Sequence, residues 1–535
     1  MSGLADRRRN LQMALAVGVV VAAVGLWAQN ESLVGVNYDD AIYVLLAKSV
    51  AAGEGYGLSH LPVDVPGVKY PPLYPLSLVP FWVLAGSQGA ALYAMKLANG
   101  LYIGVAAGLF AFLLLDLGLL VTPLALGVAL IGFLAGSIML VSSGLLSEPL
   151  YLALLFLSLW LTDRTDEQPG VGRLIAIGVL AALVFLTRSI GVALLAAVVF
   201  AVWYRHGRRS ALSVAGTAGL VILPWVGFVV VASGAVPDLL VPSYGSYGQL
   251  YLALVADSPL ATLDVVAANV GAILQTLGGK LLPELGAVAE SLVGTALLGF
   301  ALLGSRRVVK KAPATATYIW FYLFPISLWV FPPFRFVFIL FPLVLALGIV
   351  GFLGLAERAG EASGLRWRGR VIGERRWANL AILAATAALL VHQAYLEVGS
   401  VRARVWDGAQ LVKSAAGEEV IDWVIDNTEP DDVVAFEFDP LVALHTGRTV
   451  APNNYQPVHI WYSRGESPVE ELARLFREMG VRYVAVRRYV AAASGPLNEL
   501  MGRYPGGLEL IHITPGGVLV LETHRAALEV PSEAP

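Results

Sequence analysis

Two adjacent carboxylates, Asp39 and Asp40, follow the first long apolar run of the chain, in Val36-Asn-Tyr-Asp-Asp-Ala-Ile-Tyr43. An ionised group at the edge of an apolar segment needs a reason, and accepting a proton from a substrate is one. Successive residues of a helix point about 100° apart, so only one of the two carboxylates can easily face a given cavity. The structural alternative is that both cap a helix expected from Ala41 to Ala51.

Four more charged side chains stand among apolar residues and could complete a site with the acidic pair. Glu148 begins an apolar run, and Lys69 precedes the proline-rich segment Tyr70-Pro-Pro-Leu-Tyr-Pro75. Arg188 and Arg335 lie within apolar stretches. An arginine in such a place either extends its tip to the membrane surface or pairs with an anion, and we favour the anion. For Glu148 and Lys69, the alternatives of a helix cap and a surface lysine remain open.

The composition places these residues in a membrane protein. Of the 535 residues, 57% are hydrophobic and only 14% are charged. The mean hydropathy is +0.71, which is outside the range of soluble globular proteins. The chain has no cysteine, which excludes disulfides, zinc-thiolate sites and a cysteine nucleophile. We therefore expect a polytopic α-helical membrane protein.

Apolar runs of about 17 to 25 residues mark the expected membrane spans. The long apolar segments 124–161 and 174–204 are each expected to fold into a hairpin, with tips at 142–148 and 187–189. About eleven spans result, and they are expected at 11–28, 91–115, 122–142, 147–162, 173–188, 190–204, 211–233, 286–304, 315–331, 335–356 and 377–397.

Clusters of basic residues orient these spans. Arg7, Arg8 and Arg9 precede the first span, and further clusters lie within 205–209, 306–311 and 366–376. Lys and Arg accumulate on the cytoplasmic side of membrane proteins. All four clusters and the N-terminus are therefore expected on the cytoplasmic side of a cell (inner) membrane. The odd number of spans then places both hairpin tips and the C-terminus outside.

Two domains are expected. Residues 1–398 form the membrane domain, which includes outer loops at 29–90 and 234–285, and residues 399–535 form a soluble extracytoplasmic α/β domain. The second outer loop has few charges and scattered aromatic residues, so short interfacial helices are expected there.

The α/β assignment of the tail follows from its alternating patterns. Apolar residues at helical spacing over 418–425 and 468–480 alternate with short strands at 433–436 and 482–486, and a helix and two strands follow. No catalytic triad, metal cluster or phosphate loop stands out in the sequence of the tail, so a lid or scaffold is the favoured role. A structural role is expected for His445.

Taken together, outer-facing carboxylates with Lys69, Arg188 and Arg335 suit an enzyme that removes a proton from one substrate and holds the phosphate of another. Five motifs follow one another in the order Asp39-Asp40, Lys69-Tyr-Pro-Pro-Leu-Tyr-Pro75, Ser147-Glu-Pro-Leu150, Leu186-Thr-Arg-Ser-Ile-Gly191 and Pro333-Phe-Arg-Phe336. Over about residues 10–356, this ordered set resembles the GT-C glycosyltransferases. The chain is most similar to the branch that holds the protein O-mannosyltransferases and the lipid A aminoarabinose transferase.

The resemblance implies transfer of a sugar, with inversion, from a polyprenyl-phosphate donor to a lipid, glycan or protein acceptor on the outer face. By this analogy Asp39 would be the general base, and Asp40 and Glu148 would orient the substrates. The three acids could instead bind a divalent cation, the candidate cofactor. Asp40 stands where relatives often have Glu, and Tyr70 separates the lysine from the prolines. The expected donor-phosphate ligands are Lys69, Arg188 and Arg335, and the expected substrate loop contains Tyr70, Pro71, Pro72 and Tyr74.

Two other functions remain open. A lipid or glycan transporter or flippase would also be polytopic, but the sequence shows no internal repeat, and its ionisable residues gather at one membrane face rather than at the midplane. The chain could also be a non-catalytic cell-envelope assembly protein that acts through its tail. In that case, changing Asp39 should not impair its function. No feature points to nucleic acid as a partner.

Overall fold

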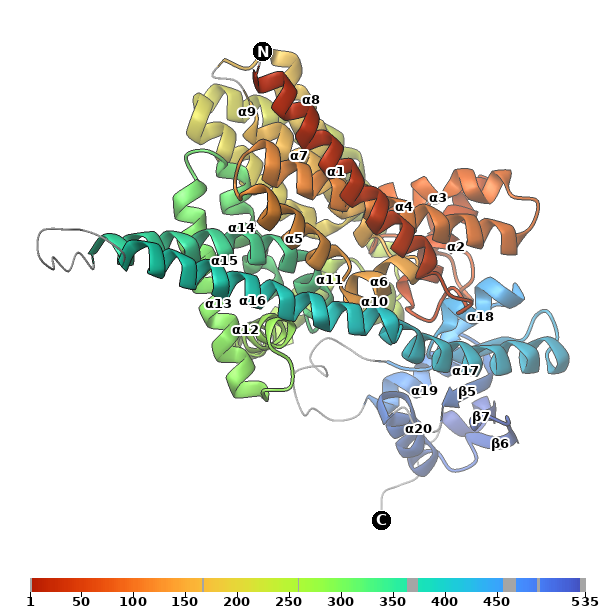
Figure 1. The fold of residues 1–535 in the computed structure, drawn as a ribbon. Coiled ribbons are helices and arrows are strands. Elements are labelled where there is room, and N and C mark those ends of the chain that lie inside the picture. Colours follow the sequence, from red (N-terminus) through yellow and green to blue (C-terminus); the bar gives the residue numbers. More distant parts are fainter. Residues whose placement is uncertain are drawn as a thin grey trace, which may run out of the picture.

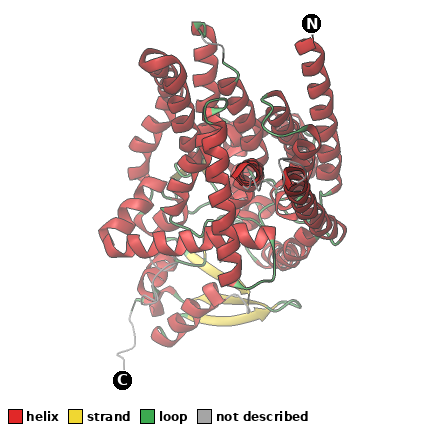
Figure 2. Cartoon of the chain, turned by 60° about the vertical axis from the view of Figure 1, so that its left-hand side comes forward, coloured by secondary structure: helices red, strands yellow, loops and turns green. Residues whose placement is uncertain are grey.

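The computed structural model describes residues 2–165, 168–257, 259–362, 374–455, 468–487 and 491–529. Helices form a large bundle, and a small domain with a β-sheet lies at one end of it, close to the C-terminus (Figures 1 and 2). This arrangement confirms the expected fold class, a helical membrane domain followed by an α/β domain.

Apolar composition explains the long helices of the bundle. Among the described residues, five helices (α1, α4, α9, α13 and α15) are long and apolar enough to cross a membrane. The pair α5 and α6, bent by 53°, gives a sixth if it forms one span. The bundle helices are α1 (Ser2–Trp27), α4 (Gln88–Asp116), α5 (Thr122–Phe133), α6 (Gly136–Ser143), α7 (Glu148–Asp163), α8 (Val171–Thr187), α9 (Val192–Ala232), α13 (Ala287–Val308), α14 (Pro313–Ser327), α15 (Phe334–Ala362) and α16 (Glu374–Arg402).

The expected number of about eleven spans is not confirmed. Helices α7, α8 and α14 lie where spans were expected, but each has fewer than 18 residues. Both expected hairpin turns are present, because α8 and α9 are separated by the 3-10 turn η1 (Ser189–Gly191), and a short loop separates α6 from α7. Inside α9, Gly207 has φ 78° and joins two helices at a kink, within the basic cluster that was expected to separate two spans.

The two outer loops contain regular structure. The first holds α2 (Asp39–Ala52), the antiparallel pair β1 (Gly57–Leu58) and β2 (Val65–Pro66), and α3 (Leu73–Leu84). Helix α2 matches the helix expected from Ala41 to Ala51, and the apolar α3 begins directly after Pro71 and Pro72. The short helices expected in the second loop are present, and α12 is longer than expected. They are η2 (Ser233–Ala235), η3 (Asp238–Leu240), α10 (Val241–Tyr244), α11 (Tyr247–Asp257) and α12 (Pro259–Leu281).

The α/β domain follows α16 and is built on a five-stranded sheet in the order β4-β3-β5-β7-β6. Strands β4, β3 and β5 are parallel, and β7 and β6 are antiparallel additions. Its elements are α17 (Val405–Asn427), β3 (Val433–Phe436), α18 (Asp439–Thr446), β4 (Val450–Pro452), α19 (Val469–Glu478), β5 (Val481–Arg487), α20 (Ala491–Arg503), β6 (Leu508–Ile513), β7 (Val518–Thr523) and η5 (Arg525–Leu528).

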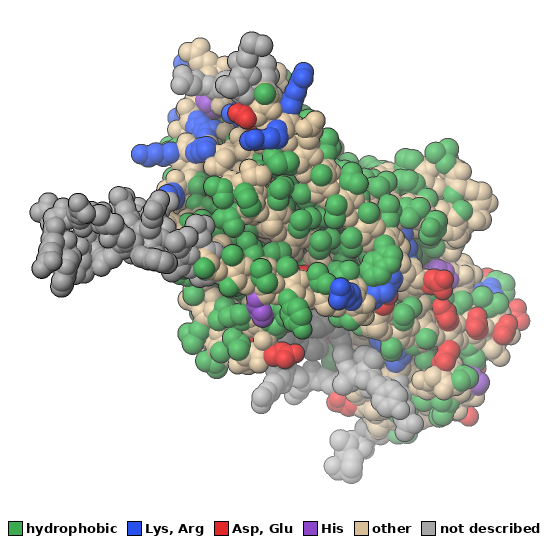
Figure 3. Space-filling view, viewed as in Figure 1, with side chains coloured by type: hydrophobic (Ala, Val, Ile, Leu, Met, Phe, Trp, Pro, Cys, Tyr) green, Lys and Arg blue, Asp and Glu red, His purple; other side chains and the backbone are tan. Residues whose placement is uncertain are grey.

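The surface of the molecule differs between its two ends. Hydrophobic side chains cover most of the visible face of the bundle, Lys and Arg gather at the end where the chain begins, and Asp and Glu gather over the α/β domain (Figure 3). Basic residues on one side are typical of the cytoplasmic face of a membrane protein. The orientation stays a prediction, and Arg366, Arg368 and Arg370 of the fourth basic cluster lie outside the described residues.

Candidate functional site

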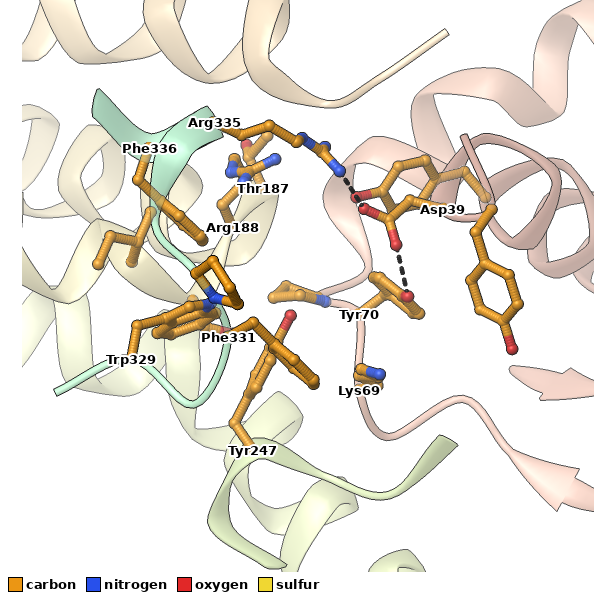
Figure 4. Close-up of a pocket in the computed structure, with 16 residues that line it drawn as sticks. Asp39, Lys69, Tyr70, Thr187, Arg188, Tyr247, Trp329, Phe331, Arg335 and Phe336 are labelled. Atoms are coloured by element: carbon orange, nitrogen blue, oxygen red, sulfur yellow. Dashed lines mark hydrogen bonds and ion pairs between the residues drawn. The ribbon is translucent and has the colours of Figure 1, made fainter. Parts of the chain in front are cut away.

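A cavity of about 320 Å³ lies where several helix ends meet the first outer loop (Figure 4). Asp39 is the first residue of α2, Arg188 stands between α8 and η1, and Arg335 is in the first turn of α15. Lys69 and Tyr70 reach the cavity from the loop before α3. Helix ends suit such a site, because they can present charged side chains in fixed positions at the edge of an apolar bundle.

Asp39 uses both carboxylate oxygens. The Tyr70 hydroxyl donates to Oδ1 at 2.7 Å, and Arg335 Nη1 donates to Oδ2 at 2.8 Å. Burial opposes the charge, but the nearby Arg335 and the Tyr70 hydrogen bond together hold the pKa of the Asp39 carboxyl below its usual value. Its side chain keeps 24% of its surface exposed to the cavity, so a substrate can reach this ionised carboxylate.

Arg335 also binds Glu148, which lies behind it and is fully buried. The guanidinium donates to Glu148 Oε1 from Nε at 3.2 Å and from Nη2 at 2.7 Å. The other oxygen, Oε2, is 2.9 Å from Arg188 Nη1. Asp39, Glu148, Arg188 and Arg335 therefore form one ionic network, the acid–arginine cluster, in which each arginine contacts Glu148 and Arg335 bridges the two acids.

Arg188 is fixed by further contacts that the sequence patterns did not reveal. Its Nη1 donates to Ser147 Oγ at 2.8 Å, and that oxygen lies 3.1 Å from the Tyr43 hydroxyl. The guanidinium carbon is 5.3 Å from the centre of the Phe336 ring, a cation–π contact. Ser147 directly precedes Glu148 in the sequence, and this position beside a candidate site residue could have pointed to it.

On the opposite side of the cavity, the Lys69 side chain is held by a contact with the second outer loop. Its ammonium donates to the backbone carbonyl of Ser243 at 2.7 Å and lies 5.4 Å from the centre of the Phe331 ring. Burial lowers the pKa of Lys69 to about 8, although the charge of Asp39 opposes that shift. We call Lys69, Tyr70 and the Ser243 carbonyl the lysine wall.

Four of the expected site residues do not line the cavity: Glu148, which is buried behind Arg335, and Asp40, Pro72 and Tyr74. The Asp40 side chain is 1% exposed and accepts hydrogen bonds from Asn37 Nδ2 at 3.3 Å and from the Ala41 amide at 3.1 Å. Burial raises the pKa of Asp40 to about 6. Pro72 precedes the first residue of α3, and Tyr74 is buried with its hydroxyl on Asn99 Oδ1 at 3.0 Å. As helical geometry requires, the two neighbouring acids point to different surroundings.

The backbone immediately before Asp39 is strained. Tyr38 has φ 66° and ψ −64°, and the Asp39 amide donates to the Asn37 carbonyl at 2.8 Å. These values define the γ-turn of positive φ, which is rare for any residue that has a side chain. The Tyr38 side chain lines the cavity, so this turn sets the directions of both Tyr38 and Asp39.

The carboxylates do not converge on a metal site. Asp39 and Glu148 are bridged by the Arg335 guanidinium, while Asp40 faces Asn37. In the part of the chain that the structure describes, no three His, Asp or Glu side chains are grouped to hold a metal ion. The proposed divalent site of Asp39, Asp40 and Glu148 does not fit this arrangement, and the positive charge between two of these acids is that of Arg335.

The charge balance of the site favours an anion. Lys69, Arg188 and Arg335 bring three positive charges to the cavity region, against two negative charges from Asp39 and Glu148. Aromatic side chains that sequence reasoning did not single out, Tyr247, Trp329 and Phe331, complete the lining (Figure 4). Such a site can bind a phosphate beside an ionised carboxylate, with flat apolar surfaces for a sugar ring or a lipid.

Comparison with solved structures identifies the architecture. The chain aligns with the crystal structure of ArnT from Cupriavidus metallidurans bound to undecaprenyl phosphate, with a TM-score of 0.51, 14% sequence identity, and coverage of 96% of this chain and 98% of that chain. The chain has the GT-C fold. The apo structure of the same ArnT aligns with a TM-score of 0.46 at 14% identity, again over 96% of this chain and 98% of that one. No protein-family model matches the chain, and no curated protein matches it significantly in sequence.

The GT-C fold confirms the resemblance that the ordered sequence motifs carried. That fold extends through the α/β tail as well as the helical bundle, because the alignment covers nearly the whole chain. At 14% identity, this likeness shows the fold and not the role of any single residue.

Proposed function

We propose that this protein is a glycosyltransferase that moves a sugar from a polyprenyl-phosphate donor to a hydroxyl group of a lipid, glycan or protein acceptor. The observation that carries this proposal is the cavity in which an accessible, ionised Asp39 lies beside three cationic side chains. The GT-C fold and the binding of undecaprenyl phosphate by the aligned ArnT support the choice of donor.

The proposed reaction is a single displacement. The acceptor hydroxyl oxygen attacks the anomeric carbon of the donor sugar, and its proton passes to the Asp39 carboxylate. The bond between that carbon and the phosphate oxygen breaks, and the electron pair remains on the polyprenyl phosphate. Attack opposite the leaving group inverts the anomeric configuration.

The cationic side chains stabilise the charge that develops on the leaving phosphate. Arg335 and Lys69 line the cavity and are the main candidates to bind its oxygens, and Arg188 adds a third positive charge. Charge-assisted hydrogen bonds of this kind contribute roughly 1.5 to 3 kcal/mol each. Glu148 holds both arginines from behind, so they are positioned before the substrate arrives.

Arg335 couples donor binding to the base. In the structure its Nη1 is bound to Asp39 Oδ2, which keeps the pKa of Asp39 low and the carboxylate weakly basic. When the phosphate of the bound sugar donor accepts the Arg335 hydrogen bond instead, Asp39 loses its stabilising partner. The pKa of Asp39 then rises. Asp39 then becomes a stronger proton acceptor when the donor is in place.

The proposed setting is the outer face of a cell membrane. The cavity lies in the outer-loop half of the molecule, whereas the basic residues gather at the opposite end (Figure 3). With the basic end in the cytoplasm, donor, acceptor and α/β domain are extracytoplasmic.

Direct assay of the purified protein tests this function. The full chain in lipid nanodiscs is incubated with polyprenyl-phosphate sugars and an extract of envelope lipids and glycans, and released polyprenyl phosphate is measured by mass spectrometry. We expect sugar-dependent release together with a glycosylated product of inverted configuration. Movement of the intact donor across a vesicle membrane without cleavage would instead support a flippase.

A further inference from the structure

A buried polar junction connects three segments that are distant in the sequence. The Tyr244 hydroxyl of α10 donates to Asp439 Oδ2 at the start of α18. His60 Nε2, from the first outer loop, lies 3.4 Å from the same carboxylate oxygen and 3.3 Å from the Tyr244 hydroxyl. Asp439 and Tyr244 are 0% and 1% exposed. Groups so deeply buried hold a defined geometry, because loss of a partner leaves an unsatisfied polar atom.

This junction is directly continuous with the lysine wall. Ser243, whose carbonyl accepts the Lys69 ammonium at 2.7 Å, is the residue before Tyr244 in the four-residue helix α10. The Tyr244 ring is also 6.4 Å from the ring of Tyr38, which lines the cavity. Whatever fixes Tyr244 therefore also fixes the carbonyl that orients Lys69.

Helix α18 also contacts the chain segment that leads to Asp39. His445 Nε2 lies 3.0 Å from the Val34 carbonyl, four residues before Tyr38. At Gly35, φ is 119°, and an added Cβ would come within 2.4 Å of Leu441, so this glycine allows α18 to approach the chain closely. The α/β domain thus contacts the segment that leads into the strained turn and Asp39.

We propose that Asp439 is a positioning residue for the donor-phosphate site, acting through Tyr244 and the Ser243 carbonyl on Lys69. The α/β domain is then a structural part of the transferase site rather than a separate lid. This inference rests on the proposed function, since it concerns how Lys69 is presented to the donor.

The test compares Asp439→Asn with Glu419→Gln in the full-length protein. Glu419 is a matched control, because its carboxylate binds Thr514 Oγ1 and the Gly516 amide inside the same domain, away from the cavity. We expect Asp439→Asn to raise the donor KM about tenfold with a smaller change in kcat, and Glu419→Gln to leave both near wild type. Tyr244→Phe, which removes the hydroxyl, should raise the donor KM at least as much as Asp439→Asn, whose neutral amide oxygen can still accept a weaker hydrogen bond.

A double-mutant cycle shows whether Asp439 acts through Lys69. In a Lys69→Met background, Asp439→Asn should add less than a twofold further change in donor KM, because the group it positions is already gone. Full additivity of the two changes would overturn the inference, as would an equal effect of Glu419→Gln. A purely structural role would lower the thermal midpoint without this coupling.

Failure of the proposed function gives a different result. If wild-type protein neither turns over any polyprenyl-phosphate sugar nor binds undecaprenyl phosphate, the transferase assignment fails and this inference fails with it. If wild type is active and Asp439→Asn has the donor KM of wild type, only the positioning role is overturned.

Discussion

The two sides of the cavity are built in different ways. The acid–arginine cluster comes from helix ends, and its charges are bound to one another by several short contacts within the bundle. The lysine wall comes from loops, and its cation is held by one carbonyl that depends on a distant domain. The difference indicates that the cluster is preformed, whereas the lysine wall can be adjusted without disturbing the bundle. Perturbing each side separately should therefore give distinct results.

Asp39→Asn should have the largest effect on activity. The amide keeps the size of the side chain and can still accept from Tyr70, but it cannot take up a proton. We expect kcat to fall about 10³-fold, within the usual range for loss of a general base, while donor binding and the thermal midpoint change little. Turnover is measured with a polyprenyl-phosphate sugar in nanodiscs, and wild-type kcat in this variant would rule out Asp39 as the base.

Arg335→Gln should damage both activity and stability, because it leaves Asp39 and Glu148 without their shared cation. We expect kcat/KM to fall about 10²-fold and the thermal midpoint to fall, because two carboxylates in a largely buried network lose a charged partner. Arg164→Gln is the matched control, since Arg164 pairs with Asp116 at 3.2 Å but its side chain is half exposed. Equal loss of thermal midpoint in the two variants would contradict a preformed cluster.

Changes at Lys69 should act mainly on donor binding, with a smaller effect on kcat. Lys69→Met is expected to raise the donor KM about 10- to 100-fold, because one charge-assisted contact is lost, with little change in thermal midpoint. The pKa of about 8 for Lys69 adds a pH effect: the ammonium is charged below this pH and loses its proton above it. The kcat/KM of wild type should therefore fall above pH 8, whereas Lys69→Arg should remove this fall. A fall of the same size in Lys69→Arg would assign the titration to another group.

Asp40→Asn should have the smallest effect on catalysis, since Asp40 does not line the cavity. Its folded-state pKa of about 6 exceeds the ordinary value of 3.8. The ionised form therefore costs up to about 3 kcal/mol of stability above pH 6, and nothing below about pH 4. We expect Asp40→Asn to raise the thermal midpoint at pH 8 but not at pH 4, with near-wild-type turnover. A loss of turnover as large as that of Asp39→Asn would return Asp40 to the reaction.

The sequence predicted the members of the acid–arginine cluster better than those of the lysine wall. Asp39, Glu148, Arg188 and Arg335 each stand out because an ionised group beside an apolar run is rare. Their mutual contacts could not be predicted, because they join residues up to 296 positions apart. The role of the Ser243 carbonyl could not be predicted from the sequence, because every residue has a backbone carbonyl.

The fold shows the same contrast between local and distant information. The α/β pattern of the tail and the turn at 187–189 follow from local periodicity and the placement of basic residues, and both are present. The expected number of spans is not confirmed, because hydropathy does not register the bend between α5 and α6 or the limited lengths of α7 and α8. The contact of α18 with the segment before Asp39 depends on tertiary packing, so the tail was interpreted as a separate unit.

The residue at position 38 must adopt the strained backbone of the γ-turn and also line the cavity. Glycine would adopt the backbone of the γ-turn without strain, whereas tyrosine adopts it at a cost of order 1 to 3 kcal/mol and supplies a wall of the cavity. Glycine at this position would relieve the strain, but it would also lose the packing of the Tyr38 ring against the neighbouring core and empty part of the site. Engineering a more robust form of this protein requires that position 38 be held constant and that stability be gained elsewhere.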